Sequence, residues 1–410
     1  MKIIFFTENH YAGGMDSFII TLINNWPVLS DELILIGNHN HPGLDVIEKR
    51  ITRSCKIIRH GLPMYFDLLQ RVKRSFLPRI LQQVILPIQY VLFLYYLVVL
   101  RKVLLKEMSD RLMVIAGNYP GGDTCRAAVI SWGLFSNRPQ AIFNFHNMAM
   151  TSHRAKKWIE DLIDWLVAFF TRQFITVSMA AAQSIEKRAL IADKKKTSYI
   201  YNGINPPDND ITNKRCSLKD ELGLKPDTHI CLMLGTYEER KGHKFLLQSF
   251  QRVVRKIFSA HLVICGYGLP EEIQTVHVLI DQFGLTGHVH IFNFRNDISY
   301  LLRNSDVLLV ASQYNESFGL TCAEAMAHHV PVVATRVGGL PEVVCEGEGG
   351  YCLPPDDIEG YASQIIRFLE DEGLRKDQGE KGYYRYLRMF TGERMTREYA
   401  QIICKGKGEA

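Results

Sequence analysis

The chain lacks the cysteine patterns that build disulfide frameworks or zinc sites. Its nine cysteines are scattered over 410 residues, are odd in number and include no C-x-x-C pair. This pattern excludes a small disulfide-stabilised scaffold and the usual zinc spacings, and it favours a reducing compartment. The chain also lacks an N-terminal apolar run long enough for a signal peptide, because the run Ile3–Phe6 is short. We therefore expect a cytoplasmic protein.

A strong excess of one charge is also missing, since 48 Lys and Arg face 43 Asp and Glu. The charged fraction of 22% and the hydrophobic fraction of 47% exclude a disordered chain. The halves differ, however: residues 1–205 carry 25 basic and 15 acidic side chains, and residues 206–410 carry 23 and 28. This asymmetry indicates that the first half meets a polyanion or an anionic membrane. The run Lys194–Lys196 lacks interleaved aromatics, so no nucleic-acid partner is expected.

The length exceeds that of one ordinary domain, which holds ~100–200 residues. Strand-like runs alternate with helical stretches in both halves, a pattern typical of βαβ units and parallel sheets. We predict an α/β protein with a Rossmann-like domain at 1–205, a second one at 206–385 and a C-terminal helix at 386–410 that packs back on the first. The first helix is predicted at Ser17–Leu29. The predicted strands are Lys2–Thr7, Leu33–Gly37, Leu112–Ala116, Ala141–Phe145, Phe174–Ser178, His229–Gly235, His261–Gly266, Val289–Phe292, Val307–Ala311 and Pro331–Thr335.

A basic and apolar segment at about 65–106 stands out in the first domain. Its stretch Ile80–Leu100 is largely apolar, although three glutamines and a proline interrupt it. A spanning helix needs ~20 mostly apolar residues, and basic residues on both sides contradict a spanning orientation. Two interpretations remain open: a segment that lies on an anionic membrane surface, or a core helix packed on the first sheet.

The strongest motif follows the predicted strand Val307–Ala311 and opens a helix. The loop around Gly319 lets backbone N–H groups approach a ligand, and the start of a helix favours an anion. Glu316 and Glu324 are eight residues apart and lie on roughly one helix face. Carboxylates beside an anion site suit a ligand with hydroxyls as well as phosphates. The alternative is a Glu316 that caps the helix and a solvated Glu324.

A second motif, Gly235–His243, follows the first strand of the second half. Arg240 and Lys241 are adjacent there, beside glycines at a strand-to-helix turn. An Arg fork and a Lys point charge suit phosphate oxygens. A solvated basic pair is the alternative. Near the start of the first helix, Asp16 is expected to cap the helix.

Together, these segments resemble the signature of the retaining glycosyltransferase family four, with its two-glutamate E-x7-E motif. The resemblance covers essentially the whole chain and implies a GT-B fold, in which two Rossmann-like, doubly wound domains face each other across a cleft that holds a nucleotide-sugar. It rests on Gly13-Gly14, His146, Ser178, Asn202-Gly203, Gly235 to Gly242, Glu316–Glu324, Pro331–Thr335 and Gly338–Val344.

By this resemblance, Glu316 contacts hydroxyls of the transferred sugar and Glu324 contacts the ribose. Arg240 and Lys241 hold the diphosphate, and His146 lies near the sugar. The chain departs from the family at Thr236, where many members have Arg, and at Asn293, where a glycine is expected. The implied catalytic residues are Glu316, His146, Arg240 and Lys241, and the remaining donor-binding residues are Gly13, Gly14, Phe294, Arg295, Ser317, Phe318, Gly319, Leu320 and Glu324.

No metal and no cofactor are expected. Metal-dependent transferases use a D-x-D pair at the end of a strand, whereas the D-x-D here, Asp208-Asn209-Asp210, lies in a Pro-containing linker. Fixed positive charge from Arg240, Lys241 and helix N-termini is expected to stabilise the leaving diphosphate instead. The acceptor then attacks from the same face, and a diphosphate oxygen takes its proton.

The sequence therefore predicts a retaining, metal-independent glycosyltransferase. Its donor is a nucleotide-sugar, for which UDP is the commoner family choice and GDP the alternative. The acceptor is expected to be a polysaccharide or a lipid-linked oligosaccharide, reached by a peripheral protein at the inner face of the plasma membrane. Rival hypotheses are an epimerase or phosphorylase on the same fold, and a non-catalytic nucleotide-sugar-binding subunit of a polysaccharide assembly complex.

Overall fold

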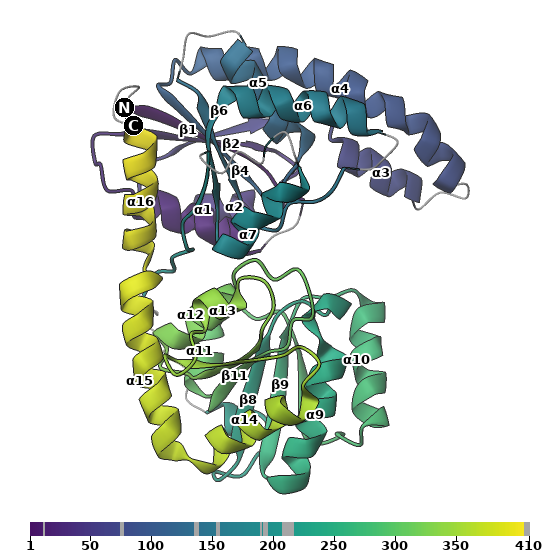
Figure 1. Ribbon diagram of the computed structural model, residues 1–410, viewed down its shortest axis with the longest axis vertical. Coiled ribbons are helices and arrows are strands. Elements are labelled where there is room, and N and C mark those ends of the chain that lie inside the picture. The colour runs from purple at the N-terminus through teal and green to yellow at the C-terminus, as the bar shows by residue number, and fades with distance from the viewer. Residues whose placement is uncertain are drawn as a thin grey trace. The chain divides into compact units, whose positions relative to one another are not determined.

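The computed structural model describes residues 1–10, 13–73, 78–134, 139–152, 156–188, 191, 196–206 and 217–405, with the backbone alone for 71, 73 and 78–86. It forms two compact units, shown in Figure 1. Unit 1 comprises Met1–Tyr201 with Gly392–Ala410, and unit 2 comprises Asn202–Thr391. These boundaries lie a few residues from the predicted ones at 205 and 385. The second boundary differs because helix α15 (Glu372–Met389) runs through position 385 without a break, and the buried Phe390 still packs on Phe318 of unit 2.

Unit 1 is built on a seven-stranded parallel sheet with the order β3-β2-β1-β4-β5-β6-β7. Its central strands are almost wholly apolar because helices cover both faces. Successive residues of β1 enter different cores: Ile4 and Phe6 enter one, and Ile3 and Phe5 the other. The strands are β1 (Lys2–Glu8), β2 (Glu32–Asn38), β3 (Lys56–His60), β4 (Arg111–Ala116), β5 (Ala141–Phe145), β6 (Thr171–Thr176) and β7 (Thr197–Tyr199).

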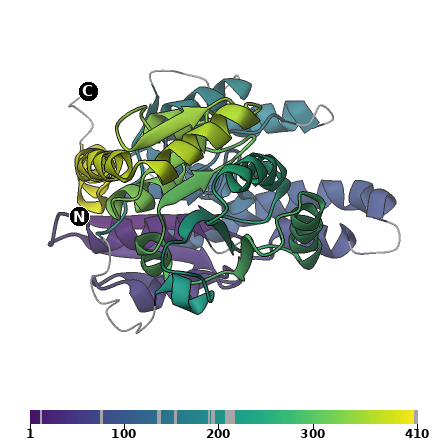
Figure 2. The same cartoon turned by 90° about the horizontal axis from the view of Figure 1, so that it is seen from below.

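Two sets of helices cover this sheet. The Ile3 core is closed by α1 (Gly14–Asn24), α2 (Leu44–Arg50) and α16 (Gly392–Cys404). The Ile4 core is closed by α4 (Pro78–Lys106), α5 (Asp123–Leu134) and α6 (Lys157–Phe170). Figure 1 and Figure 2 both show α3 (Tyr65–Lys73) and the first part of α4 projecting beyond one side of the sheet. The short α7 (Met179–Gln183) follows β6.

The C-terminal helix α16 returns to unit 1 and completes its core. Tyr399 packs edge-on against Phe18 of α1, with ring centroids 5.4 Å apart, and its hydroxyl lies 2.9 Å from Nδ2 of Asn144 on β5. Met395 and Ile403 are fully buried in the same cluster. Unit 1 therefore takes part of its core from a segment that lies 255 positions from Asn144 in the chain.

Unit 2 contains a six-stranded parallel sheet with the order β10-β9-β8-β11-β12-β13. The strands are β8 (His229–Leu234), β9 (Ala260–Gly266), β10 (Val289–Asn293), β11 (Val307–Val310), β12 (Val332–Thr335) and β13 (Gly350–Leu353). The helices are α8 (Leu218–Glu221), α9 (His243–Lys256), α10 (Pro270–Gln282), α11 (Ile298–Arg303), α12 (Leu320–Ala327), α13 (Leu340–Val343), α14 (Ile358–Glu370) and α15.

All ten predicted strands overlap observed ones, but three short strands, β3, β7 and β13, were not predicted. Each lies at or next to the edge of its sheet, where a continuous apolar run is not required. The predicted first helix is wrong at its C-terminal end. Helix α1 stops at Asn24, because Pro27 disfavours helical backbone just before it, and Leu29 is 90% exposed.

The apolar stretch Ile80–Leu100 lies within the 29-residue helix α4. Phe93, Tyr96 and Leu100 face the core, whereas Val91 and Leu94 are 65% and 64% exposed. By length and composition, Pro87–Lys106 is the one described helical segment that could cross a membrane, and 22% of its apolar window is buried. The helix thus packs on the first sheet along one side and exposes apolar side chains along the other.

Candidate functional site

The candidate site of unit 2 lies at the carboxyl ends of β8 and β11. These neighbouring strands mark the point where the strand order of the sheet reverses. Ligands in doubly wound sheets bind at such a point, because the loops after the two strands diverge to opposite faces. The loop after β8 carries Arg240 and Lys241, and the loop after β11 carries Glu316.

Gly242 allows these two loops to pack closely. Its φ of +76° is left-handed, and a Cβ atom at this position would lie 2.0 Å from the carbonyl oxygen of Ala311. Next to it, the amide of Gln313 donates to the carbonyl oxygen of Arg240 at 2.8 Å. Only glycine combines this backbone conformation with this approach. The loop after β8 is thereby held against the end of β11.

This packing brings together Lys241 and Glu316, two of the predicted catalytic residues. The Nζ of Lys241 lies 2.6 Å from Oε2 of Glu316, and the hydroxyl of Ser312 donates to the same oxygen at 2.9 Å. Glu316 is only 9% exposed. Burial opposes its ionisation, but the charge of Lys241 and the two hydrogen bonds outweigh burial and lower the pKa of Glu316. The site therefore holds an ionised carboxylate beside an ammonium group.

Arg240 adds a second cation to the same loop. Its Nε pairs with the carboxylate of Glu238, and its side chain is 28% exposed. Nearby, the hydroxyl of Thr236 is buried and has no hydrogen-bond partner among the described residues. The loop after β8 thus offers two cationic side chains and an unsatisfied hydroxyl, all of which can bind phosphate oxygens.

The start of α12 contributes backbone N–H groups. Gly319 precedes the helix with a φ of +89°, and a Cβ here would lie 2.6 Å from Cδ2 of Leu340. The first N–H groups of a helix have no intrahelical partner, and the helix dipole is positive at this end. Ser317 and Phe318 are buried in this loop, and Leu320 begins the helix. The predicted donor-binding segment therefore has the geometry of an anion-binding helix start.

Glu324 lies one turn into α12 and is partly buried. Burial raises the pKa of its carboxyl to about 7. Glu316 and Glu324 thus differ in protonation: the first is ionised beside Lys241, and the second takes up a proton near neutral pH. The alternative in which Glu324 is simply solvated does not fit this burial.

The predicted residues of unit 1 lie near the carboxyl ends of its strands. Helix α1 begins at Gly14, and the amide of Gly13 donates to Oδ2 of Asp16 at 2.9 Å. The other carboxylate oxygen of Asp16 accepts from Nε2 of the buried His41 at 2.8 Å. Asp16 is thus the predicted capping residue, and it fixes the backbone that leads into α1.

His146 follows β5 and is almost entirely buried. Its ring packs edge-on against Phe18 with centroids 4.3 Å apart. Burial lowers the pKa of His146 to about 3, so its imidazole is neutral at physiological pH. Its Nε2 has no hydrogen-bond partner within the described part of the chain. A neutral ring with one unsatisfied nitrogen can donate to or accept from a ligand hydroxyl, but it cannot supply positive charge.

Phe294 and Arg295 occupy the loop after β10, at the edge of the sheet. The ring of Phe294 is 64% exposed. The guanidinium of Arg295 is held by Glu221 at 2.6 Å and by Asp297 at 2.7 Å. The structure thus gives Arg295 a role in fixing α8 against this loop, and the predicted contact of both residues with a nucleobase stays a prediction.

No group of three or more His, Cys, Asp or Glu side chains that could hold a metal ion occurs among the described residues. The D-x-D sequence Asp208–Asp210 lies outside them, as do Lys194 and Lys195.

Sequence reasoning missed two contributors to the site. The hydroxyl of Ser312 shares Glu316 with Lys241, and Gly242 sets the distance between the two loops. The position of Ser312, four residues before Glu316 at the end of a strand, was the available signal. No sequence signal indicated the close approach at Gly242, because this approach depends on the position of Ala311 at the end of another strand.

Comparison with known proteins finds a family match over most of unit 2. Residues 215–385 match the family described as glycosyl transferases group 1. N-acetyl-α-D-glucosaminyl L-malate synthase of Bacillus anthracis is 31% identical over 240 residues, which make up 58% of this chain. The match spans 61% of that relative's own length. This part of the chain is therefore similar to glycosyltransferases.

Two solved structures resemble the chain over nearly its whole length. A glycosyltransferase from Rickettsia africae has a TM-score of 0.76 at 19% identity, with 98% of this chain and 97% of that chain covered. The Anabaena protein HepE, solved in complex with UDP, has a TM-score of 0.73 at 18% identity, with 98% and 99% covered. The predicted GT-B fold, with its two Rossmann-like units, is thereby confirmed.

Proposed function

We propose that the protein is a retaining glycosyltransferase that moves a sugar from a nucleotide-sugar to a glycan acceptor without a metal ion. The observation that carries this proposal is the contact between Lys241 and Glu316 at the switch point of unit 2. It supports the proposal because a cation that can bind a diphosphate and a carboxylate that can accept from sugar hydroxyls lie 2.6 Å apart. The group 1 family match covers the segment that contains both residues.

In the proposed mechanism, unit 2 binds the donor through its diphosphate. Arg240, Lys241 and the N–H groups at the start of α12 bind the phosphate oxygens, and they stabilise the charge that develops as the sugar–phosphate bond breaks. Glu316 accepts hydrogen bonds from sugar hydroxyls and remains ionised beside Lys241. Because these charges are fixed in the folded protein, little reorganisation is required during the reaction.

The acceptor hydroxyl attacks the anomeric carbon from the face that the diphosphate leaves. The bond between the anomeric carbon and the acceptor oxygen forms as the bond to the diphosphate oxygen breaks. The acceptor proton passes to a diphosphate oxygen, so no carboxylate is needed as a nucleophile. The neutral imidazole of His146 is proposed to orient a sugar hydroxyl through its unsatisfied nitrogen.

Glu324 is proposed to bind the ribose of the nucleotide. An ionised carboxylate is the better acceptor for two hydroxyls, so ribose binding favours loss of the proton that burial retains near pH 7. The UDP complex of HepE supports UDP over GDP as the nucleotide. Phe294 and Arg295 remain the proposed contacts of the base.

The acceptor is proposed to be a polysaccharide or a lipid-linked oligosaccharide at the inner face of the plasma membrane. Support comes from the exposed apolar side of α4 and from the basic residues that follow it, Lys102 and Lys106. A peripheral protein at an anionic surface uses this combination of apolar and basic side chains.

The proposal is tested with labelled UDP-sugars and GDP-sugars, membrane extracts as acceptor and a chelator in the buffer. We expect a labelled α-linked product with a UDP-sugar, unchanged by the chelator and absent with Glu316→Gln. Free epimerised sugar or sugar phosphate would instead identify an epimerase or a phosphorylase. Activity that the chelator abolishes and Mn²⁺ restores would overturn the metal-free mechanism.

A further inference from the structure

Helix α6 buries the acidic side chains of Glu160 and Asp164 and exposes large apolar side chains on another side. Four large apolar residues at helical spacing are exposed: Trp158 by 72%, Leu162 by 53%, Trp165 by 52% and Phe169 by 56%. Trp165 and Phe169 stack with centroids 5.8 Å apart. We call these four residues the aromatic stripe. Such a stripe is unusual for a surface helix, whose apolar face normally packs on the core.

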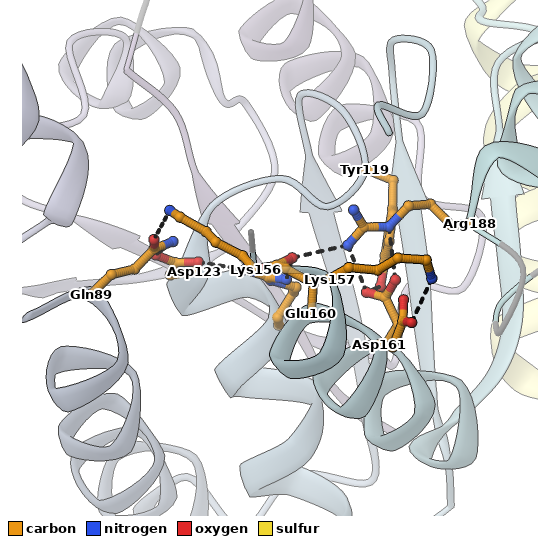
Figure 3. A network of polar contacts seen from close by, with 10 residues as sticks. Gln89, Tyr119, Asp123, Lys156, Lys157, Glu160, Asp161 and Arg188 are labelled. Carbon is orange, nitrogen blue, oxygen red and sulfur yellow. Dashed lines mark hydrogen bonds and ion pairs between the residues drawn. The ribbon is translucent and has the colours of Figure 1, made fainter. Parts of the chain in front are cut away.

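Buried ion pairs fix the rotation of α6 about its axis. Arg188, 3% exposed, donates to Asp164 at 2.7 Å and to Glu160 at 3.0 Å (Figure 3). Arg126 of α5, which is 2% exposed, binds the same Glu160 at 2.7 Å. Tyr119 adds a hydrogen bond of 2.8 Å to Asp164. Because Glu160 and Asp164 must face these partners, the aromatic stripe is held on the opposite side of the helix.

The same network joins α6 to α4. Lys156, which immediately precedes α6, donates to Gln89 of α4 at 2.9 Å, and Gln89 donates to Asp123 at the start of α5 at 3.0 Å (Figure 3). Both α4 and α6 lead into parallel strands of one sheet, so they run in roughly the same direction. The exposed Val91, Leu94, Tyr95 and Val98 follow Gln89 along α4, as the exposed residues of α6 follow Lys156.

Both helices expose large apolar side chains to solvent. Helix α5 lies between them, and its residues Thr124–Trp132 are buried. The exposed side of α4 adds Val91, Leu94, Tyr95 and Val98, each 49% exposed or more. Beyond these residues on α4 come the exposed Lys102 and Lys106. Each of the two helices thus exposes an apolar side that carries Trp or Tyr, and α4 adds basic side chains at one end of its own.

We infer that the aromatic stripe of α6 inserts into the interface of an anionic lipid bilayer beside the exposed side of α4. Trp and Tyr prefer this interface because an apolar ring and a polar N–H or O–H group suit its two sides. Basic residues at the rim attract anionic headgroups. The inference rests on the proposed function at a membrane surface but does not depend on the sugar chemistry. A vesicle assay without any nucleotide-sugar therefore tests it separately from glycosyl transfer.

The tryptophans provide a direct readout. Of the four in the chain, Trp26 and Trp132 are 2% exposed and already lie in apolar surroundings. A blue shift of Trp emission on adding vesicles therefore reports on Trp158 and Trp165. With the wild-type full chain and vesicles of equal parts phosphatidylglycerol and phosphatidylcholine, we expect a blue shift and quenching by lipids brominated on their acyl chains. Bound protein without shift or quenching would overturn the insertion.

Variants then assign the contact to α6. Trp158→Ser with Trp165→Ser is expected to lower the fraction that sediments with these vesicles by about tenfold or more, since two large apolar side chains no longer leave water. Phe258→Ser, at a residue of unit 2 that is 79% exposed, is the matched control. It is expected to change the fraction of protein that sediments with vesicles less than twofold. Vesicles of phosphatidylcholine alone should bind more weakly than the mixed vesicles.

Two results would contradict the inference. One is equal sedimentation of the double variant and the wild type. The other is a double variant that keeps vesicle binding but converts a wild-type dimer to a monomer in size-exclusion chromatography, which would assign the surface to a second copy of the chain. Circular dichroism and thermal melting of each variant verify folding, and the fluorescence of the wild type provides a test that needs no variant.

Discussion

Lys241 and Glu316, 75 positions apart in the sequence, form a partly buried ion pair of 2.6 Å where the strand order of the second sheet reverses. The pair explains how a carboxylate stays ionised at 9% exposure. It also prepares the site for two different ligand groups. When the ammonium of Lys241 binds a diphosphate, Glu316 still accepts hydrogen bonds from the Ser312 hydroxyl and from hydroxyls of the ligand.

Lys241→Ala is expected to abolish most of the activity. It removes a diphosphate-binding cation and leaves Glu316 buried without its main partner, so the pKa of Glu316 should rise. We expect the transfer rate to fall by about 10²–10³, as on removal of one transition-state donor. The rate and the affinity for UDP are the measurements. Lys381→Ala, which removes an exposed pair with Asp377, should leave both unchanged; a similar loss there would deny Lys241 a special role.

Gly242→Ala should destabilise the protein more than Gly223→Ala. Both glycines have left-handed backbone, with φ of +76° and +67°, so each substitution carries the same conformational strain of about 1–2 kcal/mol. A Cβ at Gly223 meets nothing within 4 Å, whereas at Gly242 it meets the carbonyl oxygen of Ala311. Only Gly242→Ala should therefore also weaken UDP binding, by moving Lys241. Urea unfolding and UDP titration of both variants test this, and equal effects would contradict it.

The sequence predicted much of the fold because the sheets are parallel and buried on both faces. Runs such as Ile3–Phe6 and Val307–Val310 are apolar at every position, and only a covered strand has this pattern. The residues of the candidate site could also be predicted, since they lie in short loops after such strands. Their contact could not, because the distance between Lys241 and Glu316 depends on Gly242 packing against Ala311.

The orientation of α6 shows the limit of sequence reasoning most clearly. Apolar residues occur all around this helix, and its acidic residues would normally indicate the solvent side. The structure reverses that expectation, because Arg126 and Arg188 reach Glu160 and Asp164 from other elements. No local pattern in 157–170 records these partners. The exposed aromatic stripe therefore became visible only with the coordinates.

Stability should fall as pH rises from about 4.5 to about 7 through the titration of Glu324. Its carboxyl has a pKa of about 7 in the folded protein against an ordinary value of 4.5, so the folded state keeps a proton that the unfolded chain releases. The stability that this proton provides is present below pH 4.5 and is lost as pH rises through 7, a change of about 3 kcal/mol. Glu324→Gln should flatten this part of the dependence of the melting temperature on pH.

The same group should couple UDP binding to proton release. If the ribose hydroxyls favour the carboxylate, binding near pH 7 lowers the pKa of Glu324 and releases part of a proton. Calorimetry in two buffers with different ionisation enthalpies measures this release. Binding without proton release in the wild type, or with the same release in Glu324→Gln, would contradict the ribose contact.

His146 should act on stability in acid but not as an acid or base in catalysis. Burial lowers the pKa of His146 to about 3, from 6.5, so the unfolded chain takes up a proton that the folded state excludes. The stability that this provides is present above pH 6.5 and is lost as pH falls toward 3. His146→Asn should therefore show a shallower loss of stability in acid. It should lower the transfer rate without changing the shape of its pH profile between 5 and 8.

The ion pairs of α6 should differ sharply in their effect on stability according to burial. Arg188→Met leaves Glu160 without one of its two cations and Asp164 without its cation, both in the interior, and is expected to cost about 3–5 kcal/mol of unfolding free energy. Lys157→Ala removes the neighbouring pair with Asp161, which is shorter at 2.6 Å, but Lys157 is 62% exposed. Its loss should cost ~0.5 kcal/mol or less, because water screens the pair. Urea unfolding of both variants makes the comparison within one helix. Equal stability of the two variants would refute the role assigned to the buried pairs. If Arg188→Met also lowers vesicle binding although the aromatic stripe is intact, the network both stabilises α6 and positions this helix for the membrane.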